Sequence, residues 1–181
     1  MSKLQVGDDA PAIILPAIDG TTFDLSKHKG KKVILTFYRF ASCPFCNIRI
    51  HRIIKRWKEF PSDTVMVGIF DADMASLKRR INKNHDVPFI IVADETYETY
   101  NQNGVYKSLF RVMLAPIRRP FTMLHAMLKG YVPLTLSTKK LSTIPVDVLI
   151  DEDGKVVKAH YCKDTVDHLP IETMVRFARG E

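Results

Sequence analysis

The stretch FYRFASCPFCN, residues 37–47, decides the fold because it joins two kinds of structure through a pair of cysteines. Cys43 and Cys46 enclose a Pro-Phe pair shortly after the apolar run KKVILTFY (31–38), which is typical of a strand buried on both faces. Residues 47–60 then change to helical spacing, with an apolar residue every three or four positions. The two cysteines are therefore expected at a strand-to-helix turn.

The same pattern continues toward the C-terminus. TVMVGIFD (64–71) and VPFIIVAD (87–94) have the composition of buried strands, and a basic helix is expected between them at about 73–84. Strands joined through a helix form a parallel pair with a right-handed crossover. Farther along, IPVDVLIDEDGKVVKAHY (144–161) predicts a β-hairpin, and residues 168–180 predict a closing helix.

Two further segments complete the predicted organisation. Residues 1–32 predict an opening segment with a small hairpin, and residues 105–135 predict a helical insert before the late hairpin. We expect an α/β fold with a central mixed β-sheet flanked by helices, and one domain over residues 1–181. The insert is expected to pack beside the cysteines as a lid or dimer surface, because its apolar load is large for a surface in water.

Composition and charge limit the function classes. Of the 181 residues, 46% are hydrophobic and 26% are charged, and no run approaches the roughly 18 apolar residues of a membrane span. The N-terminus has no basic segment followed by an apolar core, so we expect a cytoplasmic protein. The net charge is +7, and no acidic residue lies between Glu98 and Asp147. Because zinc-finger spacing and a phosphate-binding loop are absent from the sequence, nucleic-acid binding is not expected.

In a reducing compartment a CxxC pair predicts a redox couple or a metal site. A helix N-terminus lowers the pKa of a thiol from about 8.5, and a two-residue gap lets the sulfurs form a disulfide. A zinc site needs further ligands, and the pair His160 and Cys162 is expected two strand spacings away, roughly 10 Å. We therefore favour a redox couple over a metal site or inert thiols, with no metal and no cofactor. Cys162 is predicted to be a plain thiol, and the other histidines to be surface or capping residues.

Three segments resemble the redoxin branch of the thioredoxin-like superfamily, which holds the alkyl hydroperoxide reductase/thiol-specific antioxidant proteins and the peroxiredoxin-like proteins. They are VGDDAPAIILPAIDGTTFDLSKHKGKKVILTFY (6–38), FYRFASCPFC (37–46) and STIPVDVLIDEDGKVV (142–157). The resemblance covers most of the chain. It implies a thioredoxin-like fold and thiol–disulfide chemistry at Cys43 and Cys46.

The resemblance leaves the order of attack open. In the thioredoxin pattern Cys43 attacks and Cys46 resolves the mixed disulfide, whereas the peroxiredoxin pattern FYPxxxTxxC reverses these roles. In that pattern Arg39 takes the place of the Pro, Cys43 that of the Thr, and Pro145 that of an Arg in the late hairpin. Since the lost Thr and Arg would polarise a peroxide, we expect disulfide reduction to exceed peroxidase activity.

The segment TIP (143–145) resembles the cis-proline loop of thioredoxins. The resemblance implies a cis Ile144–Pro145 bond facing the cysteines, with the backbone of Ile144 pairing with an extended substrate. Arg39 lies close to the pair in sequence and adds positive charge. We expect Pro145, Ile144 and Arg39 to position the substrate.

Two functions from different classes follow. The first is a thiol–disulfide oxidoreductase of peroxiredoxin-like type that reduces protein disulfides or peroxides and is recycled by a thioredoxin or glutathione system. The second is a non-catalytic interaction module, whose basic helical insert binds an acidic partner or a membrane surface. The apolar insert also allows a homodimer.

Overall fold

The computed structural model describes residues 2–82, 85–118, 120–131 and 141–181. Its main sheet has five strands in the order β5-β4-β3-β6-β7. Their bounds are Val33–Phe37 for β3, Val65–Phe70 for β4, Ile90–Ala93 for β5, Val146–Ile150 for β6 and Val156–Tyr161 for β7. β3 is parallel to β4 and antiparallel to β6, so the sheet is mixed, as predicted.

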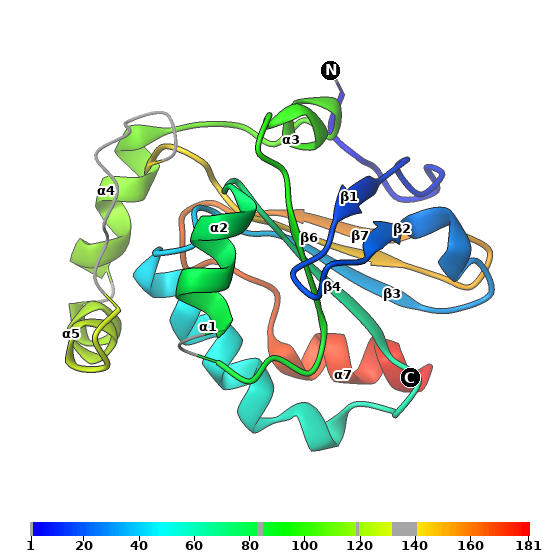
Figure 1. The fold of residues 1–181 in the computed structure, drawn as a ribbon. Coiled ribbons are helices and arrows are strands. Elements are labelled where there is room, and N and C mark those ends of the chain that lie inside the picture. Colours follow the sequence, from blue (N-terminus) through cyan, green and yellow to red (C-terminus); the bar gives the residue numbers. More distant parts are fainter. Residues whose placement is uncertain (1, 83–84, 119, 132–140) are drawn as a thin grey trace.

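Helices cover one face of this sheet, and a small hairpin lies on the other face together with the short helix α3 (Figure 1). The helices are α1 Pro44–Lys55, α2 Met74–Leu77, α3 Glu98–Gln102, α4 Leu109–Arg118, α5 Pro120–Leu128 and α7 Ile171–Arg179. The hairpin consists of β1 Ile14–Pro16 and β2 Thr22–Asp24. None of the described helices combines the length and the apolar character needed to cross a bilayer. The predicted element order is confirmed.

Each central strand contributes to two apolar layers, because successive side chains of a strand point to opposite faces. Ile34 and Met66 pack with α1 and α7, whereas Leu35 and Val67 pack with the small hairpin and the aromatic residues of α3. The continuous apolar runs of the sequence thus reflect burial on both faces.

The helix that carries the cysteines begins where the run of β3 ends. Cys43 is the N-cap residue of α1 and Pro44 opens the helix, a position where the missing N–H of proline costs nothing. Ile50 and Ile53 bury the predicted apolar stripe against the sheet. Both cysteines are therefore held at the positive end of a helix that packs firmly on the core.

A glycine in β4 makes room for the residue that precedes Arg39. A Cβ atom on Gly68 would lie 2.9 Å from Cε2 of Tyr38, which is closer than side chains pack. The ring of Tyr38 instead covers Gly68 and stacks on Phe70, with 4.9 Å between the ring centroids. The position of Tyr38 at the end of β3 thus depends on this glycine.

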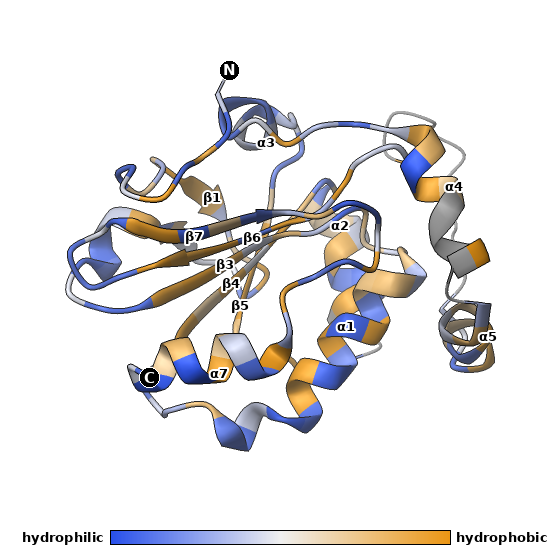
Figure 2. Ribbon diagram, turned by 180° about the vertical axis from the view of Figure 1, so that it is seen from behind, coloured by the Kyte–Doolittle hydropathy of each residue, from blue (hydrophilic) through white to orange (hydrophobic). Residues whose placement is uncertain are grey.

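The insert packs on α1 through α5, where Ala126 contacts Ile48 and Tyr131. Most of its other large apolar side chains face outward, contrary to the expectation that they are buried. Eight of those that the structure describes are 49–83% exposed: Leu109, Phe110, Met113, Ile117, Phe121, Leu124, Met127 and Leu128. Figure 2 shows α4 and α5 at one side of the molecule, beyond α1, with hydrophobic bands on them. Residues 132–135 of the predicted insert lie outside the described residues.

Candidate active site

Cys43 and Cys46 lie together at the start of α1, as the CxxC spacing predicts. Both are reduced, and neither side chain has exposed surface. The side chain and the backbone N–H of Cys46 both act on the Cys43 sulfur and favour its thiolate form. The two sulfurs are therefore close enough to exchange a proton and, with small movement, to form a disulfide.

Arg39 is the charged partner of this pair. Its Nη1 lies 3.3 Å from Sγ of Cys43, and its Nε donates to the carbonyl of Thr143 at 3.0 Å. A third hydrogen bond runs from Nη2 to the carbonyl of Leu141. The side chain is only 3% exposed, so its charge acts on the sulfur without the screening of bulk water.

The two thiols differ sharply in acidity. Burial alone would raise the pKa of Cys43, but the hydrogen bond from Cys46 and the charge of Arg39 outweigh it and lower that pKa to about 6. Burial raises the pKa of Cys46 well above its usual range, and the neighbouring Cys43 raises it further. At neutral pH the pair therefore holds one thiolate, on Cys43, and one thiol, on Cys46.

A polar clamp that the sequence did not reveal fixes the turn between the cysteines. Nδ2 of Asn47 donates to the carbonyls of Ala41 and Cys43 at 3.0 and 2.9 Å. Oδ1 of Asn47 lies 3.0 Å from Nε2 of His85, whose pKa is lowered to about 4, mainly by burial and then by the charges of His51 and Lys129. His85 is thus a neutral donor that orients the amide, and its prediction as a surface residue is wrong.

The expected cis proline is not found. The described residues contain no cis peptide bond, so the Ile144–Pro145 bond is trans. The N–H of Ile144 donates to the carbonyl of Tyr106 at 3.1 Å, and the N–H of Cys162 donates to the carbonyl of Pro145 at 3.1 Å. The carbonyl of Tyr106, in the insert, therefore already accepts the hydrogen bond of the Ile144 N–H, which we predicted would pair with an extended substrate. The chain continues directly into β6, which pairs with β3 and β7. Ile144 and Pro145 are both buried.

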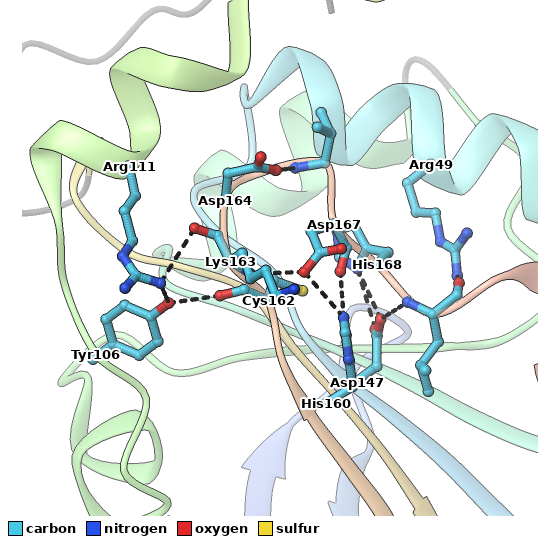
Figure 3. A network of polar contacts seen from close by, with 12 residues as sticks. Arg49, Tyr106, Arg111, Asp147, His160, Cys162, Lys163, Asp164, Asp167 and His168 are labelled. Carbon is cyan, nitrogen blue, oxygen red and sulfur yellow. Dashed lines mark hydrogen bonds and ion pairs between the residues drawn. The ribbon is translucent and has the colours of Figure 1, made fainter. Parts of the chain in front are cut away.

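The third cysteine belongs to a separate buried cluster beneath β6 and β7 (Figure 3). Ligand atoms of Asp147, Cys162 and His168 all lie within 4.8 Å of one another. The Asp147 carboxylate accepts hydrogen bonds from Thr36, from the backbone of Leu169 and from Nδ1 of His168. An ion pair therefore accounts for this cluster, which includes neither Cys43 nor Cys46. His168 is a core residue and not the surface residue that we expected.

Comparisons with known proteins agree with this architecture. The family model described as the AhpC/TSA family matches residues 6–159. The chain is 23% identical to Peroxiredoxin Bcp of Bacillus subtilis over 167 residues, which cover 92% of this chain and 90% of that protein. It is 31% identical over 109 residues to the chloroplastic Peroxiredoxin Q of Triticum aestivum, across 60% of this chain and 50% of that protein.

Structural likeness extends over nearly the whole chain. The crystal structure of Peroxidoxin BcpB from Mycobacterium tuberculosis matches with a TM-score of 0.69 at 19% identity, covering 98% of this chain and 97% of that one. This likeness confirms the thioredoxin-like fold. Together with the family model, which spans most of the sequence, it leads to one conclusion: the chain belongs to the AhpC/TSA family.

Proposed function

We propose that the protein is a thiol-dependent oxidoreductase of peroxiredoxin-like type, in which Cys43 attacks the substrate and Cys46 resolves the product. The contact between Arg39 and the sulfur of Cys43 is the observation that carries this assignment. It supports a thiolate on Cys43 and leaves Cys46 protonated as the second reactant. The order of attack is thus that of a thioredoxin.

With a peroxide, the Cys43 thiolate attacks one oxygen and the O–O bond breaks. The alkoxide leaves and takes up a proton, and Cys43 becomes a sulfenic acid. The sulfur of Cys46 then attacks that of Cys43, its proton leaves with the hydroxide as water, and a disulfide forms. With a disulfide substrate, the Cys43 thiolate attacks one sulfur and forms a mixed disulfide, and the other sulfur leaves as a thiolate that takes up a proton. Cys46 then attacks Cys43, the remaining substrate sulfur leaves with the Cys46 proton as the second thiol, and the Cys43–Cys46 disulfide forms.

The arrangement favours small substrates over extended polypeptides. Both sulfurs are buried, and the N–H of Ile144 is bonded to Tyr106 within the protein. A protein disulfide would have to displace this contact, whereas a peroxide or a small disulfide needs a smaller opening. In the peroxiredoxin pattern an Arg stands where this chain has Pro145, and we propose that the guanidinium of Arg39, next to Cys43, replaces it. Peroxide reduction is therefore better supported than the sequence suggested.

We further propose that a thioredoxin or glutathione system regenerates the dithiol in the cytoplasm. A CxxC couple acts as a reductant only where a thiol donor keeps it reduced, and a reducing cytoplasm meets this condition. In this proposal the whole chain, 1–181, acts as one redoxin domain, with residues 105–135 as an insert beside the active site.

Parallel assays of three substrates test this proposal. Wild type, Cys43→Ser, Cys46→Ser and the control Cys162→Ala are supplied with a dithiol donor and hydrogen peroxide, a small disulfide or insulin. We expect Cys43→Ser to abolish all turnover. Cys46→Ser should react once and stop, with the sulfenic acid or mixed disulfide found on Cys43 by mass spectrometry. Turnover that survives in Cys43→Ser would transfer the attacking role to Cys46.

The insert supports a second function, attachment to an anionic membrane surface. Its exposed apolar side chains lie within a stretch that has no acidic residue between Glu98 and Asp147. The basic residues of this stretch are Lys107, Arg111, Arg118, Arg119, Lys129, Lys139 and Lys140. Apolar residues combined with excess positive charge are the composition of helices that lie on anionic lipid. A second copy carries the same charge and would be repelled, which disfavours a homodimer through this surface.

Vesicle flotation tests this second function. We expect the protein to float with vesicles that contain phosphatidylserine and to remain in solution with phosphatidylcholine alone. Phe121→Asp, at a side chain that is 83% exposed, should abolish flotation. Val6→Asp changes an apolar side chain that is 72% exposed outside the insert, and it should have no effect. Dimerisation that is lost in Phe121→Asp, without flotation, would assign the surface to a second copy instead.

A further inference from the structure

A polar cavity lies beside the first turns of α1, outside the thiol pair. Its volume is about 160 Å³. Phe45, Arg49 and Arg52 of α1 form one wall, Thr122 of α5 forms another, and Thr165 and His168 contribute from the segment before α7. A larger cavity, of about 390 Å³, lies beside the small hairpin and includes neither thiol of the CxxC pair.

Three side chains of the smaller cavity carry a buried polar atom that has no partner among the described residues. These atoms are Nε of Arg49, Oγ1 of Thr165 and Nε2 of His168. A buried polar atom without a partner costs about 1–3 kcal/mol, so three of them around one cavity form a costly arrangement. Thr165 has no exposed surface, and the His168 side chain is 5% exposed.

The hydrogen-bonding character of these atoms points to an anion. Nη2 of Arg49 is held by the carbonyl of Leu169, as Figure 3 shows for the labelled arginine, so its Nε is a remaining donor at a fixed place. The hydroxyl of Thr165 can donate. Nδ1 of His168 faces the Asp147 carboxylate, and Nε2 on the other side of the ring is left without a partner.

The charges around the cavity agree with this interpretation. Arg49 and Arg52 bring two positive charges, and no acidic residue is among the described residues that line it. The acidic groups nearby already accept other hydrogen bonds: Asp147 from Thr36 and Leu169, and Asp167 from the backbone of Lys163. The positive end of α1 adds to the same field.

We propose that this cavity binds a small oxyanion, either a free inorganic ion such as sulfate or phosphate, or the carboxylate of an organic substrate. Its volume suits the anionic group and not a whole organic molecule. Phe45, inside the CPFC motif, forms part of the wall, so an anionic group seated here would direct the rest of its molecule toward the thiols. Only this role in substrate binding rests on the proposed function; anion binding does not.

Thermal unfolding of the reduced full-length protein tests the binding. Sulfate replaces chloride at constant ionic strength, and we expect the unfolding temperature of the wild type to rise with sulfate concentration. Arg52 is exposed and Thr165 has an unpartnered hydroxyl, so Arg52→Gln and Thr165→Val should fold normally. Each should weaken sulfate binding by at least about tenfold, the effect of losing one hydrogen bond to a charged group. The control Lys55→Gln, also exposed on α1 but outside the cavity, should bind as wild type. Equal sulfate responses in all four proteins, or none in the wild type, would overturn the proposal.

A pair of substrates then separates the two sources of the anion. Reduction of 3,3′-dithiodipropionate, which carries two carboxylates, is compared with that of bis(2-hydroxyethyl) disulfide, which carries no charge. If the anion belongs to the substrate, Arg52→Gln should raise the KM for the first compound about tenfold and leave the second unchanged. If Arg52→Gln loses sulfate binding but leaves the KM for each compound as in the wild type, the cavity is assigned to a free ion. Sulfate binding in a protein that reduces neither compound and no hydrogen peroxide would refute the proposed function and leave this site in place.

Discussion

Cys43 and Cys162 are both completely buried, yet their surroundings have opposite effects on the thiol. Beside Cys43 stands a cation, Arg39, and the pKa falls to about 6 in spite of burial. Beside Cys162 stands an anion, Asp147, and its charge adds to burial in raising the pKa of the thiol. The polar neighbours of each thiol, a hydrogen-bonding Cys46 and the cation Arg39 for Cys43 and the anion Asp147 for Cys162, therefore set the direction of its pKa, and burial by itself does not.

The two buried charges, Arg39 and Asp147, are stabilised in different ways. Arg39 is neutralised by the thiolate and by two backbone carbonyls of the segment before β6. Burial alone would raise the pKa of Asp147, but His168 and Arg49 lower it well below its usual range. The charge of Arg39 thus stabilises a thiolate at Cys43. The charge of Asp147 instead forms an ion pair with His168 that joins β6 to the segment before α7.

The largest effect is expected from breaking the ion pair of Asp147 and His168. Asp147→Asn leaves the shape of the side chain but removes the partner of His168, and we expect it to lower the free energy of unfolding by about 3–5 kcal/mol. Urea unfolding followed by circular dichroism measures the loss. Asp9→Asn, which changes an exposed carboxylate paired with Lys155, serves as the control and should leave stability nearly unchanged. A small loss in Asp147→Asn would show that the neutral amide satisfies the same donors.

The next largest effect concerns the reactive side of the comparison. Arg39→Met removes the cation beside Cys43 but leaves the hydrogen bond from Cys46, so the pKa of Cys43 should rise from about 6 part of the way back to the ordinary value of about 8.5. A rise to about 8 would lower the thiolate fraction at pH 7 by roughly tenfold. A pH titration of thiolate absorbance at 240 nm follows the change. The control is Arg80→Met, which removes an arginine from the helical segment Lys78–Asn82 that follows α2. An unchanged titration would assign the low pKa to the hydrogen bond from Cys46 and not to Arg39.

The stability of the reduced protein should depend on pH through Cys43. Its pKa is lower in the folded than in the unfolded state, so the stabilisation is complete above about pH 8.5 and is lost as the pH falls toward 6. Between pH 8.5 and pH 7 we expect the free energy of unfolding to drop by about 2 kcal/mol. Urea unfolding of the reduced protein at several pH values measures this slope. The slope should vanish in Cys43→Ala, and its persistence there would identify another titrating group.

The smallest effect is expected at the other buried cysteine. Cys162 remains a thiol at neutral pH, so Cys162→Ala should change peroxide and disulfide reduction by less than about twofold. Alkylation of the native protein followed by peptide mapping should label Cys43 and leave Cys162 unmodified. Rapid labelling of Cys162 would mean that the cluster opens in solution, and the comparison would then rest on dynamics as well as on charge.

The fold could be predicted to a large extent because its signals are local. Unbroken apolar runs gave the central strands, the spacing after Cys46 gave α1, and Asp153-Gly154 gave the late hairpin, where Gly154 has a φ of 76°. The CxxC pair likewise indicated thiol chemistry, because its two-residue spacing at a strand-to-helix turn is visible in the sequence.

The charges that tune the site could not be predicted, because they depend on contacts between distant residues. Arg39 reaches Thr143, 104 positions away, and His85 reaches Asn47 across 38 positions. No periodicity reports such pairs. A distant contact also holds the segment before β6, since the insert supplies the carbonyl of Tyr106 to the N–H of Ile144. The polar residue directly after Cys46 was the one local sign of a clamp at this turn.

Gly68, beneath the ring of Tyr38, links the packing of the sheet to the reactivity of the Cys43 thiol. Any side chain at position 68 would push on the ring of Tyr38, and the backbone that follows this ring carries Arg39. The atoms nearest to a Cβ on Gly68 belong to Tyr38 and Ile91, and not to a cysteine. A substitution at position 68 would therefore change the reactivity of Cys43 without changing Arg39 or either cysteine. A side chain at this position therefore requires the ring of Tyr38, at the end of β3, to shift, and the residue that follows it is the cation beside Cys43.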